Sequence, residues 1–596
     1  MPAELTLHRL IEHARNRPQD NAYYEKVDGQ WRGTSWSTYE QQVRQVARSF
    51  LALGLEIGDA VSILGFNRPE WVLMDLGASF VGGVPAGIYT TSSPPEVEYI
   101  VSHCKARWIL VEDLDQWAKV DQRREQLPLL EKVILMRGPE TPDDPLTIGW
   151  EDFLKLGDEL EKEAEDRRLA SLESEQVGTL IYTSGTTGPP KAVMLSHQNI
   201  LKTSRVGVTE LFGLNSSDTS LSYLPLSHIA EKMFSIHGAL SAGYAVYFAE
   251  APEKVPENLK EIQPTIVFGV PRVWEKIHAA VAGKLQEVKG PKRLLLDWAR
   301  RVGSERSRHR AEGTLPGPWH RVEYALATRL LLKKVKTLMG LGQARFCASG
   351  AAPISAEVLH FFASLDLLIF EVYGQSEGSG PTSFNRPAQT RLGTVGPPLP
   401  GVEVRIAEDG EVQLRGYNVF LGYLDDPEAT AETLVDGWLC SGDLGRFDED
   451  GYLTITGRKK EILITSGGKN IAPNNIEAAL KDQELIAESM VVGDRRKYLT
   501  ALITLDEEAL DRFLVSQSLE RGDRPAGEIP EVEAAVQAAV NRVNRDLARV
   551  QQVRKFSILP RPFSVDEGEL TPTLKLKRRV ILRQWAERVE ALYADD

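Results

Sequence analysis

A ten-residue segment combines four Ser or Thr hydroxyls, two glycines and a lysine. It reads Tyr182-Thr-Ser-Gly-Thr-Thr-Gly-Pro-Pro-Lys191, and apolar runs at residues 180–182 and 192–195 flank it. Glycines let backbone N–H groups converge on an anion, hydroxyls add donors, and a lysine adds a positive charge. We therefore expect a strand, a loop that holds a polyphosphate, and a second strand.

The spacing within this segment excludes a Walker A loop. Walker A has four residues between its glycines and then Gly-Lys-Ser/Thr, whereas Gly185 and Gly188 are three positions apart and Lys191 follows a proline. For the segment taken alone, a polar turn that binds nothing is the alternative. The residues that we expect to contact phosphate are Thr183, Ser184, Gly185, Thr186, Thr187, Gly188 and Lys191.

Length, charge and cysteine content limit the class of protein. The 596 residues are enough for about three or four domain-sized units. A net charge of −14 argues against nucleic acid as the main partner. The three cysteines, Cys104, Cys347 and Cys440, lack metal-binding spacing and fit a reducing compartment. Since no secretory signal is evident at the N-terminus, we expect a cytoplasmic protein.

Strands and helices are expected to alternate over the first 400 residues. Apolar runs indicate strands at residues 59–64, 108–111, 132–136, 244–248, 265–268 and 367–370. Asn67 is expected to cap a helix that has Pro69 in its first turn. Helical patterns between most of these runs predict an α/β fold with largely buried sheets.

The pattern changes near residue 400. A hairpin is expected over residues 402–414, within a β-rich subdomain at about 390–457. The basic break Gly457-Arg-Lys-Lys-Glu461 precedes an α+β pattern, with helices near 473–480 and 530–553. We therefore expect an N-terminal domain at 1–458 and a smaller C-terminal domain at 459–596.

Further polar segments follow the loop in a fixed order. They are Leu224-Pro-Leu-Ser-His228-Ile-Ala-Glu231, Gly350-Ala-Ala-Pro353, Tyr373-Gly-Gln-Ser-Glu377, Trp438-Leu-Cys-Ser-Gly-Asp443-Leu-Gly445, Gly457-Arg458-Lys459-Lys460 and Leu570-Thr-Pro-Thr-Leu-Lys575. Together with the loop they resemble the adenylate-forming superfamily of acyl-CoA synthetases, luciferases and peptide-synthetase adenylation domains. The resemblance runs from roughly residue 10 to 585. It implies a large N-terminal domain and a small, mobile C-terminal lid.

The resemblance implies a role for each segment. His228 would lie beside the substrate carboxylate, although a lone histidine can equally be a core group. The turn of Gly350, Ala351 and Ala352 would cover the adenine, and Tyr373 would stack on it. Gly374 and Gln375 would also contact the nucleotide. Ser376, where the family has threonine, would bind the α-phosphate. Glu377, with Thr183, would hold Mg²⁺.

The later segments would bind ribose, move the lid and complete catalysis. A carboxylate that accepts two hydroxyl hydrogens suits a ribose diol, which is the implied role of Asp443. Arg458 would reach the ribose and phosphate, Lys460 would be the hinge, and Gly467, Gly468 and Lys469 would face the CoA tunnel. Lys575 would stabilise the transition state of adenylation. Leu574 replaces the family's glycine, so Lys577 is a second candidate, and a solvated helix start is the alternative.

The implied reaction joins a carboxylic acid to CoA through an acyl-adenylate, with ATP and Mg²⁺. Several variants, including Val270-Pro-Arg-Val-Trp274, are similar to long-chain fatty acyl-CoA synthetases of the bubblegum-like branch. Trp274 would then gate a fatty-acid tunnel, although a core aromatic is equally expected. The alternatives are a fatty acyl-AMP ligase, a ligase for an aryl or shorter acid, and a nucleotide-binding regulator without activity.

One basic stretch is not explained by these motifs. Residues 284–336 contain fourteen Lys or Arg against five Asp or Glu. A solvated helix face is the favoured interpretation. A weak peripheral contact with an anionic membrane, or a weak contact with the tail of a nucleotide, is the alternative. The sequence leaves a homodimer open.

Overall fold

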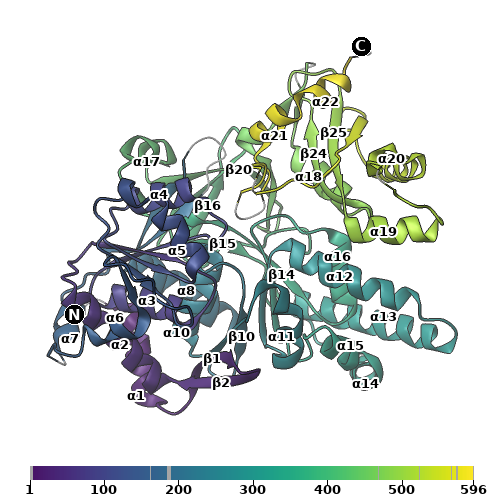
Figure 1. Ribbon diagram of the computed structural model, residues 1–596. Helices are drawn as coiled ribbons and strands as arrows, with labels where there is room; N and C mark the ends of the chain where they lie inside the picture. Colours follow the sequence, from purple (N-terminus) through teal and green to yellow (C-terminus); the bar gives the residue numbers. More distant parts are fainter. Residues whose placement is uncertain are drawn as a thin grey trace.

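Two eight-stranded sheets organise the first part of the chain (Figure 1). The computed structural model describes residues 4–161, 163–183, 189–466, 469–522, 524–565, 567–571 and 575–594. The first sheet has the order β18 (Gly422–Tyr423), β9 (Lys191–Ser196), β8 (Val177–Thr183), β4 (Val84–Ile88), β3 (Ala60–Leu64), β5 (Trp108–Val111), β6 (Lys132–Leu135), β7 (Thr147–Gly149). The strands from β8 to β7 are parallel.

The second large sheet carries most of the predicted motifs. Its order is β15 (Gly380–Phe384), β14 (Ile369–Gln375), β13 (Phe346–Ser349), β12 (Ile266–Gly269), β10 (Thr219–Ser222), β11 (Ala245–Phe248), β1 (Asn21–Val27), β2 (Gln30–Ser35). The strands from β14 to β1 are parallel. Because β12 and β13 are buried along their whole length, their sequences are continuous apolar runs without alternation.

One helix lies in the core beside both sheets. All twelve residues of α3 (Pro69–Phe80) are buried, and its side chains share a hydrophobic cluster with strands of the two sheets. Its two charged residues are buried with partners, since Glu70 pairs with Arg68 and Asp75 pairs with Lys232. The other helices of this part are α1 (Thr6–Asn16), α2 (Trp36–Ala52), α4 (Pro94–His103), α5 (Leu114–Asp121), α6 (Trp150–Lys155), α7 (Ala164–Ala170), α8 (His197–Ser204), α9 (Ile229–Glu231), α10 (Ala239–Ala242), α11 (Val255–Ile262), α16 (Ala356–Ser364) and α17 (Pro427–Thr433).

A group of helices projects at one corner of the molecule (Figure 1). It consists of α12 (Pro271–Gln286), α13 (Pro291–Glu312), α14 (Pro318–Ala327), the π-helical segment η5 (Thr328–Leu332) and α15 (Lys333–Leu338). Its inner side chains form a separate hydrophobic cluster with α16 and strands β12 to β14. The group therefore rests on the edge of the second sheet that carries the predicted adenine-binding segments.

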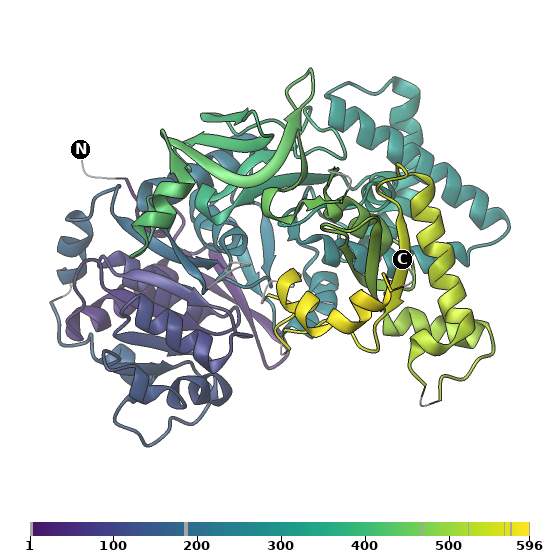
Figure 2. The same cartoon turned by 90° about the horizontal axis from the view of Figure 1, so that it is seen from above.

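A smaller antiparallel sheet leads into the C-terminal region. It has the order β16 (Val402–Ile406), β17 (Glu411–Gly416), β20 (Trp438–Phe447), β19 (Leu434–Val435), with β21 (Leu453–Arg458) also paired to β20. The C-terminal region then has its own hydrophobic clusters. Its elements are β22 (Leu463–Ile464), β23 (Asn470–Ile471), α18 (Pro473–Lys481), β24 (Ile486–Val492), β25 (Leu499–Leu505), α19 (Glu507–Ser516), α20 (Pro530–Arg545), β26 (Val553–Ile558), α21 (Arg578–Gln584) and α22 (Ala586–Ala591). Figure 2 shows this region from above.

The predicted α/β class is confirmed, but two local predictions are wrong. Asn67 does not cap α3, because its amide donates to Ser222 Oγ at 2.8 Å and to the Leu224 carbonyl at 2.7 Å. The helix predicted to reach residue 553 ends at Arg545. There the Asn544 side chain bonds both backbone groups of Val553 at 2.9 Å, which turns the chain back into β26.

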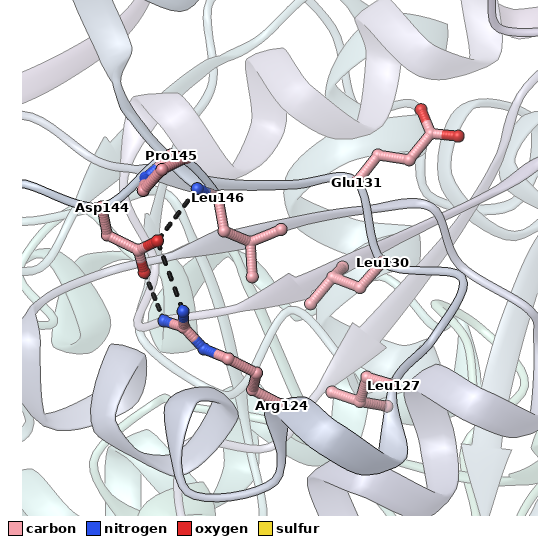
Figure 3. Close-up of a pocket in the computed structure, with 7 residues that line it drawn as sticks. All are labelled: Arg124, Leu127, Leu130, Glu131, Asp144, Pro145 and Leu146. Atoms are coloured by element: carbon pink, nitrogen blue, oxygen red, sulfur yellow. Dashed lines mark hydrogen bonds and ion pairs between the residues drawn. The ribbon is translucent and has the colours of Figure 1, made fainter.

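Two further features are the hydropathy of the helices and a cavity that lies away from the motifs. Within the described residues, no helix has both the length and the apolarity needed to cross a bilayer. A cavity of about 420 Å³ lies beside β6 and is lined by residues such as Leu127 and Leu130 (Figure 3). Arg124 pairs there with Asp144, which also accepts the Leu146 N–H at 3.0 Å. None of the predicted site residues lines this cavity.

Candidate active site

The predicted segments lie at one edge of the second sheet. Strands β10, β12, β13 and β14 are parallel neighbours, so their carboxyl ends open on the same side. The segment of His228 follows β10, the turn at Gly350 follows β13, and Glu377 follows β14. The sheet topology therefore brings together segments that are up to about 150 residues apart in sequence.

The turn after β13 requires small residues. A Cβ at Gly350 would lie 2.6 Å from Val372 Cγ1, and Ala351 has a φ of 70°, in the left-handed region. Ala351 and Ala352 are exposed, so they can contact a ligand. Next to this turn, a Cβ at Gly374 would lie 1.7 Å from the Gly380 carbonyl oxygen, which excludes other residues there.

Asp443 is fixed by two neighbours. The Tyr373 hydroxyl donates to one carboxylate oxygen at 2.8 Å, and Arg458 Nε donates to the other at 2.9 Å. Asp443 and Arg458 are directly opposite each other on β20 and β21. Since each carboxylate oxygen can accept more than one hydrogen bond, Asp443 keeps acceptor capacity for a diol.

The charges of Asp443 and Arg458 act on Lys575, although the residue as a whole is exposed. Desolvation by the surrounding protein lowers the pKa of Lys575, and the charge of Arg458 lowers it further. Asp443 and Glu377 act on its pKa in the opposite direction. The structure therefore brings together four of the predicted residues, which come from four separate segments of the chain.

A small hairpin presents Lys575. Its backbone N–H bonds Thr571 Oγ1 at 3.0 Å, and the Thr571 N–H bonds the Lys575 carbonyl at 2.8 Å. The fully buried Glu569 carboxylate anchors the hairpin through Arg561 and through Trp585 Nε1 at 2.8 Å. Lys577, the second candidate from the sequence, directly precedes α21.

His228 is also influenced by the charge of Lys575. Burial and, to a smaller extent, the Lys575 ammonium lower its pKa to about 4. Its Nδ1 accepts the Ala230 N–H at 3.2 Å, so the neutral ring carries its proton on Nε2. A neutral imidazole with a free N–H can donate a hydrogen bond to a substrate carboxylate.

Glu231 is the last residue of the segment that carries His228, and the sequence alone did not indicate its function. It is fully buried and accepts hydrogen bonds from Ser222 Oγ and Ser235 Oγ, each at 2.6 Å. Burial raises the pKa of this carboxyl to about 7, against the hydrogen bonds from the two serines. Asn67 donates to the same Ser222, so this network joins the loop that precedes α3, strand β10 and the segment of His228.

Tyr423 links two predicted residues and was missed by the sequence analysis. Its hydroxyl donates to Glu377 Oε1 at 2.8 Å, and Lys191 Nζ lies 4.9 Å from the centre of its ring. Lys191 also lies 3.5 Å from an Asp426 carboxylate oxygen. No local signal identifies Tyr423, because its position depends on the pairing of β18 with β9.

The residues present fit a magnesium ion only if a nucleotide also supplies ligands. Among the described residues, no three His, Cys, Asp or Glu side chains gather as a metal site. Tyr423 binds one oxygen of Glu377, so the other oxygen stays available. A carboxylate, the Thr183 hydroxyl and phosphate oxygens are the hard ligands that Mg²⁺ prefers.

The structure describes some of the remaining predicted residues, and the others lie outside the described residues. Thr183 and Lys191 are paired at the ends of β8 and β9, and Ser184 to Gly188 are not described. Lys460 is exposed in a 3₁₀ turn after β21. Lys469 is exposed just before β23, and Gly467 and Gly468 are not described.

Trp274 lies in the core of the helical corner. It is fully buried, and its Nε1 donates to the Ala348 carbonyl at 3.2 Å. Its ring meets Phe362 edge-on, with the ring centres 5.3 Å apart. Since Ala348 is on β13, Trp274 is attached to the strand that leads into the turn at Gly350.

Comparison with known families decides the family of the chain. The model of the AMP-binding enzymes matches residues 10–424, and the model of the AMP-binding enzyme C-terminal domain matches residues 460–596. The chain belongs to the AMP-binding enzymes. The adenylate-forming resemblance inferred from the motifs is thereby confirmed.

Several relatives cover nearly the whole of this AMP-binding enzyme. It is 38% identical to the long-chain-fatty-acid–CoA ligase ACSBG2 of Xenopus laevis, over 99% of this chain and 84% of that protein. It is 36% identical to the long-chain-fatty-acid–CoA ligase FadD15 of Mycobacterium bovis, over 98% of this chain and 96% of that protein.

Solved structures share the fold. The anthranilate CoA ligase AuaEII in complex with anthranoyl-AMP matches with a TM-score of 0.74 and 21% identity, over 99% of both chains. The A-PCP didomain of a carboxylic acid reductase from Segniliparus rugosus, in complex with AMP, matches with a TM-score of 0.77 and 19% identity, over 100% of this chain and 83% of that one. These likenesses confirm the architecture of this AMP-binding enzyme.

Proposed function

We propose that this AMP-binding enzyme is a long-chain-fatty-acid–CoA ligase. It would form an acyl-adenylate from a fatty acid and ATP, release pyrophosphate, and transfer the acyl group to CoA with release of AMP. One observation carries the chemistry, which is the grouping of Lys575 with Glu377, Asp443 and Arg458. The named activity of relatives over almost the whole chain supports CoA as the acceptor.

In the first step, a carboxylate oxygen attacks the α-phosphorus of ATP. The new O–P bond replaces the bond to pyrophosphate, which leaves, so no protein nucleophile is needed. The neutral His228 would orient the attacking carboxylate through its Nε2 proton. Lys575 would compensate charge on the α-phosphate, and Thr183 and Lys191 would hold the departing phosphates.

The nucleotide would be held by the fixed carboxylate and the tight turn. Asp443 would accept the ribose hydroxyls, and the exposed turn of Ala351 would cover adenine. We propose that Glu377 and Thr183 hold a magnesium ion, which would neutralise phosphate charge when bound. Tyr423 would orient Glu377 through its hydrogen bond.

In the second step, the CoA thiol attacks the acyl carbonyl. A C–S bond forms, the C–O bond to AMP breaks, and AMP leaves with the electron pair. We propose that residues 459–596 act as a mobile lid that turns at Lys460 between the two steps. This motion would withdraw Lys575 and bring the segment of Gly467, Gly468 and Lys469 to the thiol, with water excluded in both arrangements.

We infer that the acid is a long-chain fatty acid, from the names of the relatives and from the position of Trp274 in the helical corner. The named relatives act on long-chain fatty acids. Trp274, buried next to the strand of the adenine turn, is the proposed gate for the acyl chain. We also propose a cytoplasmic location, since all three cysteines are free thiols.

The proposal is tested by acid-dependent ATP–pyrophosphate exchange followed by CoA-dependent AMP release, with saturated acids from acetate to arachidate. We expect both activities to be highest for acids from laurate to stearate. No activity with these acids would exclude the long-chain assignment. AMP release that does not depend on CoA would indicate a fatty acyl-AMP ligase instead.

A further inference from the structure

Exposed apolar side chains gather on the helical corner. Of the eighteen large apolar side chains that are exposed in the described residues, eight lie between Leu294 and Leu338. Four of them form a line along α14 and η5: Trp319 (82% exposed), Val322 (53%), Leu326 (49%) and Leu330 (48%). Their spacing of three, four and four residues places them on one helix face.

The opposite face of the same helix is well packed. His320, Ala327 and Leu332 are buried, and Ala327 and Leu332 belong to the hydrophobic cluster of the helical corner. The helix is therefore held by one face while its other face stays in solvent. A contiguous apolar face of this kind marks an interaction surface more often than a chance arrangement.

Basic side chains flank the apolar line. Residues 318–338 contain five Lys or Arg and one acidic residue, Glu323, in a chain whose net charge is −14. Arg329, Lys333 and Lys334 are exposed, and none of them has an ion-pair partner within the described part of the chain. The charge of this face is thus opposite to that of the whole molecule.

We propose that the α14–η5 face, defined by Trp319, Val322, Leu326, Leu330 and the flanking cations, docks on an anionic lipid bilayer. The apolar line would enter the boundary between headgroups and acyl chains, and the long basic side chains would reach the phosphates. Tryptophan suits this position because its ring is apolar and its N–H is polar.

The charge of the α14–η5 face favours an anionic bilayer over a second copy of the chain as its partner. A symmetric dimer through this face would bring Arg329, Lys333 and Lys334 close to the same cations of the other copy. An anionic membrane instead supplies many negative groups without a fixed pattern, which suits exposed cations that have no ion-pair partner among the described residues. A bilayer therefore satisfies both the apolar and the basic parts of the face.

Docking at this face would bring the acid to the enzyme. The inner side of α14 and η5 shares its hydrophobic cluster with Trp274, the proposed gate. A long-chain acid dissolved in the bilayer would then lie on the side of the helical corner nearest to the gate. This consequence depends on the proposed function, whereas docking itself does not.

Vesicle flotation tests the docking. The full-length chain is mixed with phosphatidylcholine vesicles with and without phosphatidylglycerol, at low and high salt. We expect binding to the anionic vesicles only, with release by salt. Trp319→Glu should weaken binding at least about tenfold. The triple variant Arg329→Glu, Lys333→Glu, Lys334→Glu should weaken it at least about a hundredfold, since each cation near an anionic surface contributes on the order of 1 kcal/mol.

Val515→Glu is the matched control, since Val515 is 79% exposed on α19, outside the proposed face. It should bind vesicles like the wild type. Each variant should keep the wild-type circular dichroism and the acyl-CoA yield with cyclodextrin-delivered acid, so lost binding reports on the surface and not on folding. The acyl-CoA yield also separates failure of docking from failure of the proposed function.

Two results would overturn the proposal. The first is wild-type binding to anionic vesicles that Trp319→Glu does not weaken, or no binding at all. The second is a wild type that does not bind vesicles and has the mass of two chains, together with a Trp319→Glu variant that has the mass of one chain. That result would identify a second copy of the chain as the partner of this face. Light scattering after gel filtration measures that mass.

Discussion

Side chains of the candidate active site hold one another in place through hydrogen bonds. Tyr373 and Arg458 hold both oxygens of Asp443, and Tyr423 holds one oxygen of Glu377. Because these groups are already oriented, little reorganisation is needed when charge develops on the nucleotide. Lys575 differs from them, since it reaches the site from a hairpin in the C-terminal region.

Replacing Lys575 by alanine should separate the two half-reactions. We expect the rate of ATP–pyrophosphate exchange to fall at least about a hundredfold, because a charge aimed at the transition state is lost. Thioester formation from supplied acyl-AMP should stay close to the wild-type rate. Lys577→Ala, two residues away, is the control and should leave both rates nearly unchanged. Equal loss of both steps in Lys575→Ala would mean that the lysine supports the structure and not the adenylation step.

Among the elements, the segment that carries His228 depends on a buried carboxyl. Glu231 joins this segment to β10 through Ser222 and to η3 (Lys232–Gly238) through Ser235. Burial raises its pKa from 4.5 to about 7, so the folded protein binds this proton more tightly than the unfolded chain does. The resulting stabilisation is complete below about pH 4.5 and is lost as the pH rises through about 7.

Glu231→Gln should therefore flatten the dependence of stability on pH. Between pH 5 and pH 8 the wild type should lose roughly 3 kcal/mol more of its free energy of unfolding than the variant does, since one pKa unit corresponds to about 1.4 kcal/mol. Urea unfolding at both pH values measures this difference. Glu253→Gln, at an exposed position, is the control and should keep the wild-type slope. An unchanged slope in Glu231→Gln would show that Glu231 ionises normally in the folded state.

Much of the fold and the site was readable from local patterns. The buried strand β5 is a continuous apolar run, β3 is apolar except for Ser62, and motif segments such as that of Tyr373 follow runs of this kind. What failed depends on contacts between distant elements. Asn67 bonds Ser222, 155 residues away, instead of capping α3. Tyr423 acquires its role only when β18 pairs with β9, and a single sequence does not show that pairing.

At the scale of the whole molecule, the two regions have the arrangement that the proposed mechanism assigns to the first half-reaction. Asp443 and Glu377 act electrostatically on Lys575, which is the placement that the proposed mechanism assigns to adenylation. Across the same boundary, Arg272 on α12 lies 3.5 Å from Asp506, the N-cap residue of α19. If the C-terminal region swings between the steps, this ion pair must break before the thioester step, so it should favour the first arrangement.

Arg272→Glu should weaken adenylation selectively. The new carboxylate would face Asp506 and lie next to Glu275, which is 3.9 Å from Arg272 in the wild type. Because such partly exposed pairs contribute up to about 1 kcal/mol, we expect pyrophosphate exchange to fall up to about fivefold. Thioester formation from supplied acyl-AMP should be unchanged or faster, and the effect should shrink as salt is added.

Arg415→Glu is the control for this change. Arg415 pairs with Glu403 at 2.8 Å within one sheet, so its reversal alters charge without touching the boundary between the regions. It should leave the ratio of the two half-reaction rates at the wild-type value. If Arg272→Glu lowers both rates by the same factor, the ion pair supports general stability. A change in the ratio that disappears at high salt would instead show that this contact favours the arrangement in which Lys575 reaches the nucleotide.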